Sequence, residues 1–139
     1  MILSLVLALI FFGLGLLHFY WMMGGEIGFL ESLPTKENGK RVLNPGKADI
    51  AMVGIGLSVF GIFYMLKSGL VAIEQAQWML DNGTWIIPII FLFRAVGDFN
   101  YVGFFKKVRK TEFAKWDTQI YSPLCLAIAM IGLTIHWEI

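Results

Sequence analysis

Four long apolar runs alternate with shorter polar segments along this 139-residue chain. The runs cover residues 2–23, 50–66, 85–105 and 120–137. Each is close to the length of about 20 residues that a helix needs to cross a hydrocarbon core about 30 Å thick. The pattern therefore predicts an all-α fold, with residues 1–139 forming one domain of four transmembrane helices packed as a bundle.

The polar segments between the runs are predicted to be connections. Pro34, Asn38-Gly39 and Pro45-Gly46 are turn formers and favour a loop in the first connection. Residues 71–80 mix apolar and polar side chains, which predicts a short amphipathic helix on the membrane surface before the third run. The first run has no basic residues before it and no small-x-small cleavage site after it, so we expect it to be retained as a helix.

Composition and charge support this interpretation and orient the chain. Hydrophobic residues make up 58% of the sequence and charged residues 15%, which is too apolar for a soluble domain of this size. The first connection carries four Lys or Arg residues and the third carries five, whereas the second carries only Lys67. The positive-inside rule then places the first and third connections in the cytoplasm and both termini outside. The basic run 106–110 is more typical of contact with anionic lipid than of a nucleic-acid site.

Charged residues inside the third run raise the question of function. Counted from a helix end near residue 105, Arg94 lies about 16 Å deep and Asp98 about 10 Å deep. An arginine near the bilayer midplane requires an internal partner. Asp98 is four residues further along the same helical face and is the expected partner. Tyr101 continues that face.

Polar groups from three runs are expected to meet at the same depth, in the cytoplasmic half of the bundle. We therefore predict a polar pocket that opens to the cytoplasm and binds an amphipathic or lipid-like molecule. His18 and Asp98 are the candidate acid and base, because a histidine near a carboxylate can exchange protons near neutral pH. The candidate ligand-binding residues are Trp21, Arg94, Tyr101, Asp117, Tyr121 and Ser122.

Other functions fit the same residues and stay open. The polar network could serve only to fix the packing of the helices, since polar groups in lipid must be satisfied internally. A transporter or channel subunit would suit a midplane arginine, although the outer half offers little polar lining. The spacing of His and acidic residues predicts no metal site, and Cys125 is the only cysteine. The sequence leaves open the cofactor, the existence of an enzymatic reaction, and assembly as a homo-oligomer.

The chain resembles a known family through motifs in three of the runs. They are His18-Phe19-Tyr20-Trp21 with Gly24-Gly25, Arg94-Ala95-Val96-Gly97-Asp98 with Tyr101-Val102-Gly103, and Phe113-Ala114-Lys115-Trp116-Asp117 with Tyr121-Ser122-Pro123-Leu124. Together they are similar to a bacterial family of small four-helix membrane proteins catalogued only as a domain of unknown function. The resemblance covers nearly the whole chain. It implies a four-helix fold and a multi-pass location in the inner (plasma) membrane, and it implies no particular chemistry.

Overall fold

The computed structural model describes residues 1–138, and within them it contains helices and no strand beyond one isolated bridge between Thr35 and Arg41. Four helical stretches are long and apolar enough to cross a membrane: Ile2–Met22 (α1), Lys47–Lys67 (α2), Gln77–Val96 (α3) and Glu112–Trp137. The predicted all-α architecture of four spans is thereby confirmed. Ile139, the last residue of the predicted domain, lies outside the described residues.

The fourth span is one continuous stretch built from three parts. It begins as α4 (Glu112–Trp116), passes through a single π-helical turn, η2 (Asp117–Tyr121), and continues as α5 (Ser122–Trp137). A short 3-10 helix, η1 (Leu30–Ser32), lies in the first connection. π-helical turns within α-helices occur frequently at functional sites.

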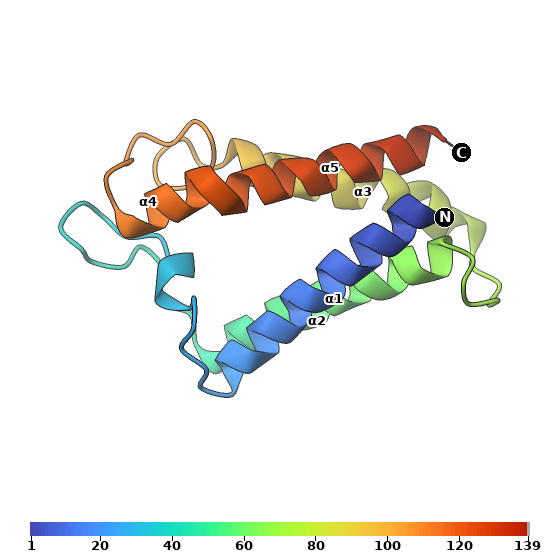
Figure 1. Ribbon diagram of the computed structural model, residues 1–139, viewed down its shortest axis with the longest axis horizontal. Helices are drawn as coiled ribbons and strands as arrows, with labels where there is room; N and C mark the ends of the chain where they lie inside the picture. The colour runs from blue at the N-terminus through green and yellow to red at the C-terminus, as the bar shows by residue number, and fades with distance from the viewer. Residues whose placement is uncertain (139) are drawn as a thin grey trace.

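The four spans are arranged as two pairs (Figure 1). Helix α1 packs along α2, and α3 packs along α5, whereas α2 and α3 touch at few positions. The two pairs meet at the end of the molecule that holds both termini and diverge toward the opposite end. The first and third connections lie at that opposite end, where the pairs are farthest apart.

Aromatic packing joins the two pairs. Phe11 of α1 is fully buried, stacks on Tyr64 of α2 at 5.8 Å between ring centroids, and lies 5.2 Å from the ring of Phe91 in α3. Ile128 of α5 belongs to the same buried cluster. Because rings and branched side chains fill this region, the space between the pairs is closed on the side of the termini.

Helix α3 differs from the predicted third span. It begins eight residues before residue 85, with Gln77 Nε2 donating to Asp81 Oδ1 at 2.7 Å in its first turn. Residues 77–80, predicted to belong to a separate surface helix, are therefore part of α3. The helix ends at Val96, because Gly97 adopts a left-handed conformation with φ 83°.

This shift changes the position of Arg94. Arg94 lies two residues before the end of α3, which corresponds to about 3 Å along the helix axis. The predicted helix end near residue 105, from which the depth of Arg94 was counted, is wrong, because α3 ends at Val96. Arg94 instead lies at the level where the third connection begins.

The fourth helix also begins earlier than predicted. Thr111 caps it, and its hydroxyl accepts from the backbone N–H of Ala114 at 3.0 Å. This early start places Asp117 inside the helical stretch and not at its entrance. The Asp117 side chain consequently points into the protein and is fully buried.

Candidate functional site

Asp117 lies at the centre of a buried polar cluster. Its Oδ1 accepts from Arg94 Nη2 at 3.1 Å and from Ser122 Oγ at 3.0 Å. Its Oδ2 accepts from the Gly103 backbone N–H at 2.8 Å and contacts Lys106 Nζ at 3.2 Å. A carboxylate offers about four acceptor positions, so Asp117 is saturated. We call these residues the Asp117 cluster: Arg94, Gly103, Lys106, Asp117 and Ser122.

Lys106 is as deeply buried as its partner. Its ammonium group donates to the Gly103 carbonyl at 3.0 Å and to Thr118 Oγ1 at 2.6 Å, besides the contact with Asp117. An ammonium group has three N–H donors, and three acceptors surround this one. Lys106 is thus fully satisfied, which indicates a structural role in holding the third connection against the fourth span.

Arg94 is the member of the cluster that is only partly satisfied. Its side chain is 34% exposed and reaches Asp117 with Nη2. Its Nη1 is buried and has no hydrogen-bond partner among the described residues. Because a guanidinium carries five N–H donors in a planar fork, Arg94 keeps donors available for a further group.

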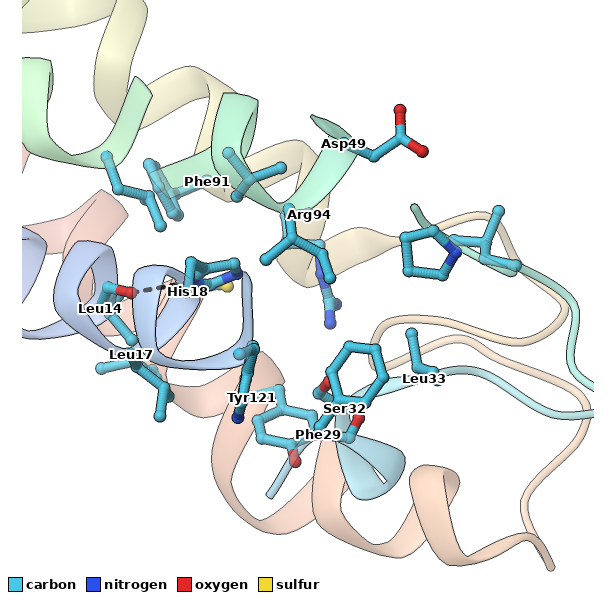
Figure 2. A pocket seen from close by; sticks show the side chains of 18 residues that line it. Leu14, Leu17, His18, Phe29, Ser32, Leu33, Asp49, Phe91, Arg94 and Tyr121 are labelled. Atoms are coloured by element: carbon cyan, nitrogen blue, oxygen red, sulfur yellow. Dashed lines mark hydrogen bonds between the residues drawn. The ribbon is translucent and has the colours of Figure 1, made fainter. Parts of the chain in front are cut away.

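A cavity of about 470 Å³ lies between the two helix pairs, at the end where they diverge. All four spans and the first connection line it, and Arg94 forms part of its wall. Figure 2 shows Arg94 extending from α3 into the space between His18 of α1 and Phe29 of the first connection. Most lining residues are apolar, and they include Leu14, Leu33, Val53, Leu57, Phe91 and Leu124. We call this space the interhelical cavity.

His18 and Trp21 line the interhelical cavity from α1. His18 Nδ1 lies 2.7 Å from the carbonyl oxygen of Leu14 (Figure 2). Since a carbonyl can only accept, Nδ1 carries the hydrogen, and the neutral ring presents Nε2 as an acceptor. The Trp21 ring lies 4.9 Å from the His18 ring, and its Nε1 donates to the Ile27 carbonyl at 2.8 Å.

Asp98 lies outside the interhelical cavity. Its Oδ1 accepts from the backbone N–H groups of Asn100, Tyr101 and Val102, at 2.8 to 3.0 Å, in an exposed turn after α3. The predicted ion pair between Arg94 and Asp98 is wrong, because their i, i+4 spacing brings side chains together only within a helix, and α3 ends between them. Partial burial raises the pKa of Asp98, but these backbone hydrogen bonds together lower it by more, so that the net pKa lies below the usual value.

The structure thus divides the predicted site residues into three groups. His18, Trp21, Arg94 and Tyr121 line the interhelical cavity. Asp117 and Ser122 lie behind Arg94 in the Asp117 cluster. Asp98 and Tyr101 belong to the exposed turn, and neither lines the cavity. Within residues 1–138 no three His, Cys, Asp or Glu side chains are grouped so that they could hold a metal ion.

Two glycines close the turn that holds the Asp117 cluster. Gly97 and Gly103 have φ of 83° and 92°, and their backbones touch across the turn. A Cβ on Gly97 would overlap the Val102 carbonyl, and one on Gly103 would overlap the Val96 carbonyl. The Phe104 N–H donates to the Ala95 carbonyl at 2.8 Å and completes the closure. Only glycine fits both positions, and the closure is what directs the Gly103 N–H toward Asp117.

Sequence reasoning missed Lys106 and the contribution of the first connection. Lys106 lies in a basic run, and from the sequence this run indicates only orientation and contact with anionic lipid. Phe29, Leu33 and Pro45 of the first connection line the cavity, although their segment was predicted only to be a loop. Gly97 was the available signal that α3 ends at Val96 and that a folded turn follows, because glycine commonly follows the last residue of a helix.

Comparison with known proteins identifies the family of this chain. The model of a protein family described as "Protein of unknown function (DUF3995)" matches residues 11–132. The matched region contains the interhelical cavity and the Asp117 cluster. No curated protein and no solved structure matches the chain.

Proposed function

Because the chain belongs to the DUF3995 family, whose description assigns no activity, we propose a function from its geometry: binding of an amphipathic, lipid-like molecule in the interhelical cavity. The observation that carries the proposal is the cavity itself. It measures about 470 Å³, within the range typical of small-molecule sites. Its wall is largely apolar, with a guanidinium on one side.

An amphipathic ligand suits that distribution of side chains. The apolar part would pack against Leu57, Val53 and Phe91, which face the cavity from α2 and α3. The polar part would lie near Arg94, His18 and Tyr121. Since the helix pairs diverge at this end (Figure 1), a ligand from the membrane interface could enter without crossing the packed aromatic core.

We further propose that this end faces the cytoplasm of a bacterial cell and that the protein is an inner-membrane protein. Nine of the eleven Lys and Arg residues lie in residues 24–49 and 106–119, which contain the first and third connections, and Lys67 alone lies in residues 67–84. Positive charge accumulates on the cytoplasmic side of membrane proteins. The cavity would then open toward the inner leaflet.

Filling the cavity should release the ligand. We expect Val53→Trp, which adds a large ring to the cavity wall, to reduce the amount of co-purifying amphiphile about tenfold, equivalent to about 1.4 kcal/mol of binding free energy. The measurement is quantitative mass spectrometry of solvent extracts from the purified protein, normalised to protein amount.

Val59→Trp is the matched control. Val59 is also on α2 and is exposed to a similar degree, 54% against 49% for Val53, but it does not line the cavity. It should retain the wild-type amount. If neither the wild type nor Val59→Trp carries any enriched amphiphile, the binding function is wrong and a structural role for the polar cluster is favoured.

His18 is the residue that we propose to exchange a proton with the bound molecule. Its unprotonated Nε2 is the acceptor, because Nδ1 is held by the Leu14 carbonyl. The predicted partnership with Asp98 is not part of this proposal, since Asp98 does not line the cavity. We expect His18→Gln to retain the same amount of ligand in a different chemical form, for example an unreacted isomer. Chromatography of the two extracts tests this, and identical ligand species from both proteins would argue against proton transfer.

A further inference from the structure

The charges around the interhelical cavity specify more about its ligand. We propose that the ligand carries an anionic head group, a carboxylate or a phosphate monoester, which binds the Arg94 guanidinium. This inference rests on the proposed function, because it identifies the class of molecule that the same cavity would bind.

The Asp117 cluster contains more positive than negative charge. Two cations, Arg94 and Lys106, share one carboxylate. Lys106 and Asp117 are both fully buried and lie 3.2 Å apart, so they neutralise each other directly. A surplus of one positive charge is left on Arg94, which faces the cavity. The Arg94 side chain is 34% exposed, but its Nη1 is buried, and a buried charged donor requires a counter-ion or a strong hydrogen-bond partner.

Asp117 cannot accept a further hydrogen bond from Arg94. Each of its oxygens already accepts two hydrogen bonds or charged contacts. Arg94 is consequently bound through Nη2 alone, and Nη1 stays buried without a partner. Carboxylates and phosphates match the fork of a guanidinium and form the strongest hydrogen bonds available to it.

No other anion of the cavity wall is positioned to pair with Arg94. Asp49 is the single carboxylate among the lining residues. Its Oδ2 accepts from the Gly46 N–H at 2.9 Å and caps the N-terminus of α2. Its favourable interaction with the helix dipole holds it there. Arg94 and Asp49 also form no ion pair within the described part of the chain, where the Arg94 carboxylate partner is Asp117.

The test compares amphiphiles that share one chain and differ in head group. Purified full-length protein in a neutral detergent is mixed with equal amounts of dodecanoate, dodecyl phosphate, dodecanol and dodecyltrimethylammonium at about pH 8, where a carboxyl group is ionised. Native mass spectrometry measures how much of each is bound. We expect one or both anions to exceed dodecanol at least about tenfold and the cation to be excluded. The ratio of dodecanoate to dodecyl phosphate identifies the head group.

Variants assign the selectivity to Arg94. Arg94→Gln should lose the preference for anions while it still binds dodecanol, and Arg94→Lys should keep part of the preference. Lys107→Gln is the matched control, because Lys107 carries the same charge at the same end, is exposed and does not line the cavity. It should behave as the wild type does. The binding of the four probes to the wild-type protein decides whether an anionic head group is preferred, even if Arg94→Gln does not fold.

The possible failures are distinguishable. Equal binding of dodecanol and both anions, removed in each case by Val53→Trp, would overturn the anionic head group and leave the proposed function intact. Binding of none of the four probes, or binding that Val53→Trp does not change, would overturn the proposed function as well.

Discussion

Alanine in place of Asp117 is expected to cost about 3–5 kcal/mol of folding stability. The substitution leaves two cations, Arg94 and Lys106, without their shared carboxylate, and Lys106 is fully buried. It also leaves the Gly103 N–H and the Ser122 hydroxyl without their acceptor. The loss should appear as a lower midpoint of thermal unfolding in detergent. Cys125 serves as the reporter, because it is buried and is the only cysteine of the chain, so a thiol-reactive dye binds it as the protein unfolds.

Asp98→Ala is the matched control for this experiment. Asp98 is a carboxylate at the same end of the molecule, but it is exposed and accepts only backbone N–H groups. We expect Asp98→Ala to lose much less folding stability than Asp117→Ala. Because its folded-state pKa lies below the usual value, its contribution is complete above the unfolded-state pKa of about 3.9 and is lost as pH falls through the folded-state pKa. At neutral pH the contribution is therefore fully present.

A double variant separates the loss of charge balance from the loss of packing. If the buried Lys106 is the main cause, Asp117→Ala combined with Lys106→Met should unfold at a higher temperature than Asp117→Ala alone, since the uncompensated buried cation is gone. Equal stability of Asp117→Ala and Asp98→Ala would show that the Asp117 cluster does not hold the third connection in place.

The number and type of spans could be predicted from the sequence because apolar runs of membrane length leave little alternative. The boundaries of the third span could not. Its first turns contain Asp81 and Asn82, whose polarity made the segment resemble a surface connection. At the other end, Phe99, Tyr101 and Phe104 extended the apolar pattern past Gly97, although Gly97 ends the helix. Local conformation, and not hydrophobicity, determines that boundary.

The candidate site was predictable in its residue types but not in its pairings. Arg94 and Asp117 are separated by 23 positions, and their contact depends on how the intervening connection folds. The helical spacing that pointed to Asp98 was a correct rule applied beyond the end of the helix. Lys106 was counted among surface charges, because nothing in a basic run distinguishes the one lysine that the fold buries. The cavity depends on the divergence of the helix pairs, which no local pattern encodes.

Gly103→Ala is expected to destabilise the protein by about 3 kcal/mol. The left-handed backbone of Gly103 disfavours any residue with a Cβ, at a cost of about 1 kcal/mol or more. The Cβ would in addition overlap the Val96 carbonyl and the Gly97 Cα. These are backbone atoms and cannot move aside as a side chain could, so the turn must open. Opening it withdraws the Gly103 N–H from Asp117, a charge-assisted hydrogen bond worth about 1.5–3 kcal/mol.

Gly39→Ala measures the cost of placing a Cβ on a backbone with positive φ, without any steric overlap. Gly39 has a similar φ of 83°, but no atom lies within 4 Å of the position of its Cβ. Its substitution should cost about 1 kcal/mol, and the Cys125 unfolding assay should place it between the wild type and Gly103→Ala. If both variants lose the same stability, backbone conformation alone explains the glycine at 103. A larger loss of stability for Gly103→Ala shows that the close approach of residues 96–97 to residue 103 is also required. This approach directs the Gly103 N–H toward Asp117, and Asp117 in turn holds Arg94 at the wall of the interhelical cavity.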